Sequence, residues 1–505
     1  MRGRALALLM AAAVAAPLAA QQVVVSPTPN KVAVTVYRSP SGGEMNLDWL
    51  DGFALVSETR HVSLPAGESE LRFEGVAGGL IPQSAVVSGL GDAVSEKNRD
   101  AKLLSPGTLL DAYLGRRVQL RRTSLATGAV REQDAVVRAS GDGVVIETDH
   151  GIEALRCTGL AETLLAPDVP ATLSAKPTLS VKVGSERPVE ADAKLTYLTS
   201  GFDWRAHYVA TLAPDERTLS LFAWLTLANG DETSFRNANA MAVAGRLNRE
   251  DVERLQPEAR PIRITCWPSQ RTDDVPLDEP PAYAPPPPPP PPPAPMAERG
   301  GEDIVVTGSR IMAEREALGD LKLYRIPIPV TVASNSQKQV ALLEQPAVKV
   351  ETLYRWQSGF GAEVDQPTSV ERILRMKNRK AAGLGLPLPA GGFTLFTNRG
   401  GRPFLLGEGE MTDRAEGETV EVALSDSPGI AVVQRQLGRK KGEATTELVV
   451  TNDQPRAVRF EARFAEDRKA KTSSAPLVRR DGSWWWTTNV PANGTATLTI
   501  HYPAS

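Results

Sequence analysis

Runs in which apolar and polar residues alternate recur along most of the chain, whereas stretches with the spacing of an amphipathic helix are scarce. Alternation with a period of two is typical of strands that bury one face of a sheet. The segment Lys31–Tyr37 is an example, because β-branched residues dominate it and Pro and Gly bound it. The sequence therefore predicts an all-β protein built mainly from β-sandwich domains. The other expected strands fall at residues 54–61, 70–74, 84–89, 178–183, 189–198, 206–212, 218–227, 262–267, 340–343, 347–354, 394–397, 419–424, 430–436, 446–451, 457–464, 484–490 and 495–502, and an edge strand that contains Pro327 and Pro329 is expected at 321–332.

A small module is predicted between residues 101 and 172. Ser105 is a suitable helix cap, Pro106 suits a first turn and Gly115 ends a helix, so one short helix opens this module. Short alternating runs separated by tight turns follow it, and they predict either a small barrel of the SH3 type or a continuation of the preceding β domain. These runs lie at residues 117–122, 135–139, 144–148 and 152–156.

An uninterrupted proline run, Pro285–Pro293, lies near the middle of the chain. It cannot donate backbone hydrogen bonds, so we expect an extended polyproline helix with its ends about 28 Å apart. We interpret it as a long surface insertion. The predicted organisation is a leader at 1–20, an N-terminal β module at 21–100, the small barrel at 101–172, the first part of a β-sandwich at 173–268, a Pro-rich linker at 269–319 and the continuation of the sandwich with a C-terminal β region at 320–505.

The N-terminus has the pattern of a secretory signal peptide. Arg2 and Arg4 precede an apolar run at residues 5–18, and small residues lead up to Gln21. The mature chain is expected to begin near Gln21 and to contain no transmembrane segment, because no later stretch approaches the length of uninterrupted apolar sequence that spans a bilayer. The sequence therefore predicts an exported protein.

Export bears on the two cysteines, Cys157 and Cys266, because an oxidising compartment permits a disulfide. Two separate buried thiols are the alternative, since spacing alone says nothing about proximity. The formal net charge of −3 gives no field that would attract nucleic acid, so nucleic-acid binding is not expected.

The usual patterns of catalytic residues are absent from the sequence, and it contains four histidines. Asp203 and His207 would share one face of a strand, but Trp204 and Tyr208 between and beside them favour a structural role. We therefore predict a protein that is not an enzyme, with no catalytic residues, no metal site and no cofactor.

Two clusters suggest binding surfaces. Trp484 and Trp486 would share one strand face, where exposed indoles could stack on sugar rings, whereas burial in a sandwich is the structural alternative. A basic cluster just before Gly383-Leu384-Gly385 could meet an anionic polymer or lipid headgroups. A solvated loop or partly helical face is the better explanation, because Glu371 opposes the cluster and the overall charge is low. This cluster contains Arg372, Arg375, Lys377, Arg379 and Lys380.

Several stretches together resemble a bacterial envelope family of unknown function that includes mucoidy-inhibitor-like proteins. The resemblance covers residues 30–90 and 190–505 and implies a β-sandwich that the proline insertion splits; no catalytic residues are established for the family. Typical members carry a long coiled coil where this chain has the predicted small barrel, and the turn at 229–232 is degenerate. The stretches that carry the resemblance are residues 64–67, 71–76, 81–84, 195–198, 201–208, 229–232, Asn378, 383–391 and 406–408.

The segment after the proline run resembles the Ton box of TonB-dependent outer-membrane receptors. It consists of Asp303, Ile304, Val305, Val306 and Thr307. Such a segment binds by adding a strand to the sheet edge of its partner, although an edge strand of the chain's own sandwich is the alternative.

These patterns predict an exported, non-enzymatic envelope protein that is periplasmic or associated with the outer membrane of a Gram-negative cell, and that binds or assembles with an envelope protein partner. A glycan-binding or glycan-acting protein that uses Trp484 and Trp486 is one alternative. A partner of the TonB system that uses Asp303–Thr307 is the other.

Overall fold

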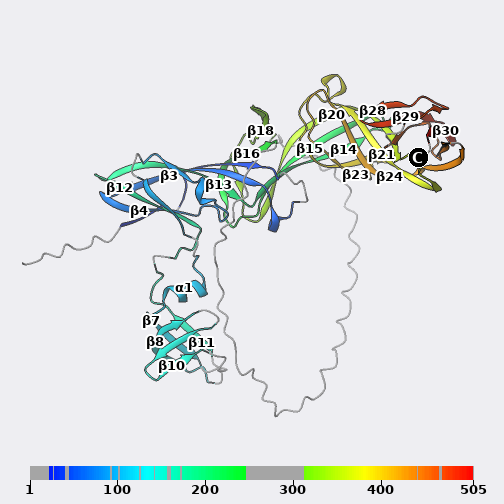
Figure 1. Cartoon of the computed structure of the whole chain (residues 1–505). Helices are drawn as coiled ribbons and strands as arrows, with labels where there is room; N and C mark the ends of the chain where they lie inside the picture. Colours follow the sequence, from blue (N-terminus) through cyan, green and yellow to red (C-terminus); the bar gives the residue numbers. More distant parts are fainter. Residues whose placement is uncertain are drawn as a thin grey trace, which may run out of the picture. The chain divides into compact units, whose positions relative to one another are not determined.

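The computed structural model describes residues 22–26, 28–39, 45–90, 94–100, 103–123, 127–140, 143–155, 161–170, 173–245, 312–440, 442–465 and 469–503. These residues form strands almost throughout, with one α-helix, α1 (Pro106–Ala112), and a few 3-10 turns (Figure 1). The predicted all-β class is therefore confirmed. The leader, the strand predicted at 262–267, the proline run, Asp303–Thr307, Cys157 and Cys266 lie outside the described residues.

The chain divides into two compact units, and the first holds residues 22–32 and 56–199. One sheet has the strand order β1-β4-β12-β6, and three strands of a second sheet follow the order β3-β13-β5. β12 pairs antiparallel with β4, although the small module separates them in the chain, so this module is inserted within one β unit. The sequence-based division was different, because it placed β4 and β12 in separate domains, at residues 21–100 and 173–268. The elements are β1 (Gln22–Ser26), β3 (Phe53–Leu64), β4 (Gly67–Glu74), η2 (Pro82–Ser84), β5 (Val86–Ser88), β6 (Val94–Asp100), β12 (Thr178–Ser185) and β13 (Val189–Ser200).

A buried ion pair holds the N-terminal strand of this unit. Arg60 and Glu58 are 0% and 1% exposed, and the Arg60 guanidinium donates to Glu58 Oε2 at 2.6 and 2.9 Å. The same guanidinium donates to the backbone oxygens of Ser26 and Glu74, at the ends of β1 and β4. Tyr197 completes the group by donating to Glu58 Oε1 at 3.0 Å, so each buried charge has hydrogen-bonding partners.

The small module has its own core, formed by Leu110, Tyr113, Leu120, Val137 and Ile146 among others. Ser105 caps α1 as predicted, through a capping box with Thr108. The sheet has the order β10-β9-β8-β7-β11, and β11 was not expected from the sequence. In the described part of the module no pairing joins the outer strands, so the sheet is open and the predicted barrel closure is not seen. The strands are β7 (Arg117–Thr123), β8 (Val130–Ala139), β9 (Val145–Thr148), β10 (Gly151–Ala154) and β11 (Ala161–Leu165).

The second unit holds residues 33–55, 200–245 and 312–503. Its first sheet runs β17-β18-β16-β2, with β19 also on β16. The larger sheet runs β23-β22-β14-β15-β20-β21-β24-β25-β30-β27, and β26, β29 and β28 continue it from β20. The elements are β2 (Lys31–Tyr37), η1 (Leu47–Trp49), β14 (Phe202–Leu212), β15 (Thr218–Asn229), β16 (Phe235–Ala244), β17 (Glu314–Leu318), β18 (Leu321–Arg325), β19 (Val330–Val332), β20 (Ser336–Ser358), β21 (Val364–Lys377), η4 (Lys380–Ala382), β22 (Gly391–Arg399), β23 (Arg402–Met411), β24 (Thr419–Lys440), β25 (Glu443–Asn452), β26 (Val458–Phe464), β27 (Thr472–Ser473), β28 (Val478–Arg480), β29 (Ser483–Val490) and β30 (Gly494–Pro503).

The edge strand expected at 321–332 is two strands. β18 pairs with β17 on one side and with β16 on the other, so it is not an edge. Pro327 and Pro329 lie in the connection between β18 and β19, where a missing N–H does not interrupt a ladder.

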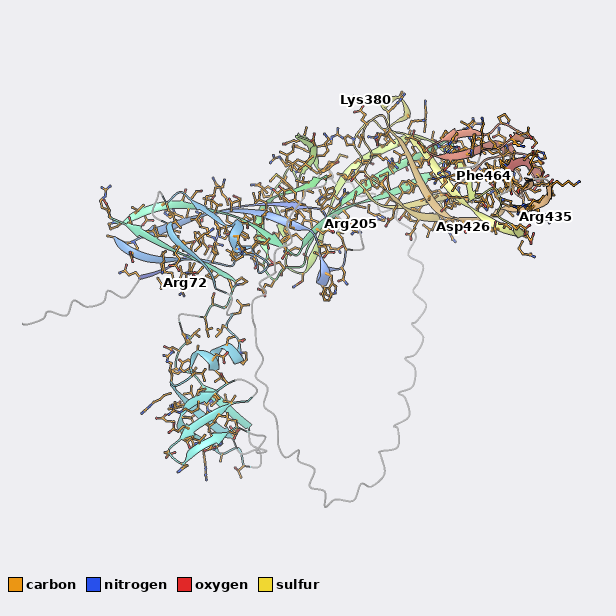
Figure 2. The ribbon with its side chains drawn as sticks, in the orientation of Figure 1. Arg72, Arg205, Lys380, Asp426, Arg435 and Phe464 are labelled. Carbon is orange, nitrogen blue, oxygen red and sulfur yellow. The ribbon has the colours of Figure 1, made fainter. Side chains whose placement is uncertain are left out.

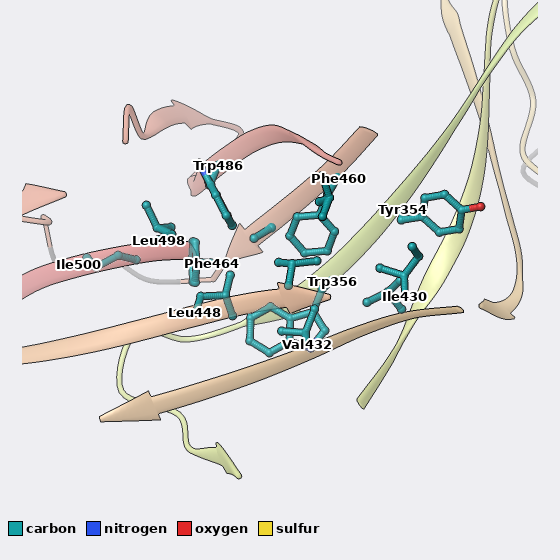
Figure 3. Close-up of a cluster of buried hydrophobic side chains, with 14 of the residues drawn as sticks. Tyr354, Trp356, Ile430, Val432, Leu448, Phe460, Phe464, Trp486, Leu498 and Ile500 are labelled. Carbon is teal, nitrogen blue, oxygen red and sulfur yellow. The ribbon is translucent and has the colours of Figure 1, made fainter. Parts of the chain in front are cut away.

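The long strand β20 joins the part of the larger sheet that contains β14 and β15 to the part that contains β21 and β26. β20 pairs with β15 through residues 336–349 and then with β21 and β26 through residues 350–358. A register irregularity falls around Pro346, so the strand continues past a proline that would interrupt a regular ladder. The strands β20, β24, β25, β26, β29 and β30 bury one apolar cluster, in which Figure 3 labels Tyr354, Trp356, Ile430, Val432, Leu448, Phe460, Phe464, Trp486, Leu498 and Ile500.

Candidate binding surface around Trp485

The three consecutive tryptophans of β29 divide between the two faces of the strand. Trp486 is 3% exposed and lies in the apolar cluster, with its ring 6.0 Å from that of Phe460 (Figure 3). Trp484 packs against the same cluster and has the Arg479 guanidinium 5.3 Å from its ring. Of the two alternatives for this pair, burial therefore holds for Trp486, and Trp484 is partly buried on the same face of β29.

Trp485 lies on the opposite face, and it is half-buried among arginines. The guanidinium carbons of Arg480, Arg355 and Arg463 lie 4.8, 5.1 and 5.8 Å from its ring centroid. These are distances at which an aromatic face attracts a cation. The indole N–H donates to the backbone oxygen of Arg480 at 3.3 Å, which fixes the ring plane. We call Trp485 with Arg355, Arg463 and Arg480 the Trp485 surface.

An ion-pair network lies beside this surface on four neighbouring strands. Arg355 on β20 and Arg375 on β21 each contact Glu421 on β24 and Glu461 on β26. The four shortest N–O distances are between 2.7 and 2.9 Å. Strand register brings the charges together, because Arg355 lies across from Glu461 and Arg375 across from Glu421. The network is largely buried, and Glu461 is 1% exposed.

The electrostatics of the network keep all four groups charged. Burial alone would raise the pKa of Glu421 and of Glu461, but hydrogen bonds and attraction from Arg355 and Arg375 outweigh it. The net effect lowers both pKa values, that of Glu421 to about 2. Burial likewise opposes the charge of the two arginines, and the glutamates raise their pKa. At neutral pH both carboxylates are ionised and paired with the two guanidinium groups.

Two of the guanidinium groups keep their charge available for a ligand. Arg463 donates to Ser483 Oγ at 3.1 Å and to Gln357 Oε1 at 3.3 Å, which are neutral acceptors. Arg480 is exposed. Among the described residues, neither guanidinium has a carboxylate within hydrogen-bonding distance. The surface therefore offers fixed positive charge beside an aromatic ring.

The network should make the protein less stable in acid. The pKa of Glu421 is about 2 when folded against an ordinary value of 4.5, so unfolding takes up protons between these values. The stability that this carboxylate contributes is complete above pH 4.5 and is lost as the pH falls towards 2. Urea unfolding at steps through this window should show a flatter pH dependence for Glu421→Gln than for the unaltered protein. Equal slopes would contradict the assignment.

The other sequence-predicted candidates do not assemble into a site. Asp203 is 2% exposed, and its Oδ1 accepts the backbone N–H groups of Ser39 and Trp204. Burial raises the pKa of Asp203, and those two hydrogen bonds act against the rise. His207 is exposed and lies 3.1 Å from Thr394 Oγ1. The two residues have different partners, as their predicted structural role requires.

The basic cluster of residues 372–380 is solvated only in part, because Lys377, Arg379 and Lys380 are exposed whereas Arg375 is largely buried. Arg375 belongs to the ion-pair network, and Lys377 at the end of β21 donates to Thr419 Oγ1 at 3.1 Å. Lys380 begins the 3-10 turn η4, where Figure 2 labels its side chain. Pairing of β21 with β20 and β24 thus distributes these side chains over different surroundings.

The described residues contain no cluster of His, Cys, Asp and Glu that could hold a metal ion, and no helix among them has the length and apolar character needed to cross a bilayer. No known family model matches the chain, and no curated protein matches it.

Proposed function

We propose that this protein is an exported, non-enzymatic binding protein of the Gram-negative cell envelope, and that the Trp485 surface holds an acidic segment of a protein partner. One observation carries the proposal. Three guanidinium groups surround one indole, and two of them have no carboxylate partner among the described residues. Export and the periplasmic or outer-membrane location are supported by the signal-peptide pattern, and membership of the mucoidy-inhibitor-like family by the resemblance in sequence.

The chemistry of the surface suits an acidic peptide. Guanidinium groups form charge-assisted, often bidentate hydrogen bonds with carboxylates, and Trp and Arg dominate the energetics of many interfaces. The surface also reaches a strand edge, because β28 pairs with β29 alone within the described part of the sheet. Val478 on β28 lies directly across from Trp485 and is 54% exposed. An apolar side chain and a strand edge beside the arginines favour a polypeptide ligand.

An acidic glycan is the second candidate. An indole bordered by guanidinium groups can contact a sugar ring while the arginines bind its carboxylate. This version of the predicted glycan-binding function uses Trp485 in place of Trp484 and Trp486. The TonB-system reading of Asp303–Thr307 stays a prediction.

Binding of defined acidic polymers tests the proposal. The mature chain should bind a poly-glutamate peptide in titration calorimetry. The double variant Arg463→Glu, Arg480→Glu should bind at least about 30-fold more weakly, since it removes two charge-assisted contacts that contribute about 1 kcal/mol or more each. Trp485→Ala should weaken binding as well.

The matched control for the double variant is Arg131→Glu, Arg187→Glu, which reverses two exposed arginines elsewhere. Trp49→Ala, which removes a tryptophan that is 75% exposed, is the control for Trp485→Ala. Binding should stay unchanged in both controls. Stronger binding of polygalacturonate than of the peptide, with the same loss in the variants, would favour the glycan. Equal binding by the surface variants and their controls would overturn both candidates.

A further inference from the structure

A strongly acidic segment lies in the stretch of chain between β16 and β17. Residues 273–279 contain four carboxylates within seven positions, and we call them the acidic segment. Its acidic members are Asp273, Asp274, Asp278 and Glu279. After Arg271 the chain has no lysine or arginine until Arg299, so this part of the sequence carries charge of one sign. The acidic segment lies outside the described residues.

The Trp485 surface has the opposite charge. Among the described residues Arg463 donates to neutral acceptors, and no carboxylate pairs with Arg480. Guanidinium groups form charge-assisted hydrogen bonds with carboxylates, which are the groups that the acidic segment supplies. Between its two acidic pairs the segment has the apolar residues Val275 and Leu277, which suit contact with the half-buried indole of Trp485. Charge and polarity are therefore complementary between the segment and the surface.

The spacing of the carboxylates also fits that of the guanidinium groups. The guanidinium carbons of Arg463 and Arg480 lie 5.8 and 4.8 Å from the ring centroid of Trp485, so no more than about 11 Å separates them. Asp274 and Asp278 are four residues apart, which corresponds to about 12 Å in an extended chain that contains proline. One acidic pair can therefore meet each guanidinium group while the residues between the pairs cross the indole.

The chain is long enough to bring the acidic segment to this surface. The described chain resumes at Met312, which forms a bridge with Ala341 on β20. Arg355 of the Trp485 surface lies 14 residues further along the same strand, a distance of about 46 Å at the rise of a strand. The 33 residues from Glu279 to Met312 can extend to about 110 Å, more than twice that distance. On the other side, 28 residues connect the segment to Gly245.

We propose that the acidic segment binds the Trp485 surface of its own chain and competes there with the acidic partner. This inference rests on the proposed function, because it names an internal ligand for the same site. A tether of this kind gives the segment an effective concentration of about 1 mM, so a weak contact is enough to occupy the surface when no partner is present. A partner then binds only if it outcompetes the segment, which excludes weak acidic ligands.

Titration calorimetry of the full mature chain with poly-glutamate tests this inference. The segment variant Asp273→Asn, Asp274→Asn, Asp278→Asn, Glu279→Gln should bind the peptide about threefold to tenfold more tightly, because the internal competitor is removed. The gain should disappear when Arg463→Glu and Arg480→Glu are added to the segment variant. A synthetic peptide with the sequence of residues 272–283 should bind the segment variant and displace poly-glutamate from it.

The matched control neutralises four other acidic residues of the same stretch, and it should bind poly-glutamate as the unaltered protein does. It is the variant Glu250→Gln, Glu253→Gln, Glu258→Gln, Glu298→Gln. An equal gain in this control and in the segment variant would overturn the inference, because net charge alone would then explain the result.

Other outcomes separate this inference from the proposed function. Equal affinity of the segment variant and the unaltered protein, with binding that still requires Arg463 and Arg480, would overturn the internal contact and leave the proposed function standing. Binding of poly-glutamate that does not require these arginines would overturn both. A gain in affinity that accompanies the loss of dimers in the segment variant would show that a second copy supplies the segment, and it would overturn binding within one chain.

Discussion

Replacing Glu461 with Gln should lower the free energy of unfolding by about 3–5 kcal/mol, since the guanidinium groups of Arg355 and Arg375 would then share the single carboxylate of Glu421, which leaves one positive charge uncompensated. Glu461 is 1% exposed and accepts hydrogen bonds from Arg355 and Arg375, at distances between 2.8 and 2.9 Å. The glutamine keeps the shape of the side chain but removes its charge, and its amide hydrogens would face two guanidinium groups. Urea unfolding followed by circular dichroism measures the change.

Glu316→Gln is the matched control for this experiment. Glu316 on β17 pairs with Arg325 at 3.0 Å outside the network, and the two side chains are 47% and 41% exposed. Exposed pairs contribute between about 0 and 1 kcal/mol, so the control should unfold almost as the unaltered protein does. A loss of stability in Glu461→Gln no larger than in the control would mean that the network carries no more than a surface pair.

The ion-pair network shows why alternation along a strand predicts the face on which a side chain lies but not the residues that it contacts. Alternation predicts that one charged residue in each strand points away from the apolar core, namely Arg355 between Tyr354 and Trp356, and Glu461 between Phe460 and Ala462. The structure confirms this for both strands. The partners of Arg375 lie 46 and 86 residues further along the chain, so no local pattern could pair them. Arg375 therefore looked like part of a solvated basic cluster.

The same limit applies to Trp484, Trp485 and Trp486. Alternation correctly separates Trp485 from the other two, but it does not say which face the sandwich covers. That depends on the strands of the apolar cluster, which pack against Trp486 from distant parts of the sequence. The sequence-based choice of Trp484 and Trp486 for glycan binding thus selected the face that packs on the core. The arginines around Trp485 come from β20, β26 and β28, so only the structure shows that they surround the ring.

Turns were predicted less completely than strands. Asn229, in a turn picked out by the family resemblance, ends β15, donates to the Thr233 oxygen and accepts from the Asp231 N–H. Asn452 ends β25 and makes the corresponding bonds, to the Arg456 oxygen and from the Gln454 N–H, in a sequence that gave no such signal. Each side chain replaces backbone partners where a strand turns away from its ladder.

Asn378→Ala should lower the free energy of unfolding by about 3–5 kcal/mol, because it leaves several buried backbone groups without partners at once. Asn378 is 0% exposed, and its Nδ2 donates to the backbone oxygens of Leu386 and Ala415, both at 2.8 Å. Its Oδ1 accepts the N–H groups of Gly385 and Leu386, at 3.0 and 3.2 Å. The Asn378 side chain thus holds the segment that contains Gly385 and Leu386 against Ala415, in the connection between β23 and β24.

The backbone of this segment has little freedom to compensate for the loss. Gly383 has a φ of 88°, and a Cβ there would lie 2.0 Å from the Ala347 oxygen, so the turn fits closely against β20. Asn398→Ala, which removes an exposed asparagine from β22, should change stability by about 0.5 kcal/mol or less and serves as the control. Urea unfolding of both variants and the unaltered protein makes the comparison. If Asn378→Ala unfolds like Asn398→Ala, then water or a rearranged turn replaces the four hydrogen bonds, and the resemblance in this segment has a cause other than the stability of the fold.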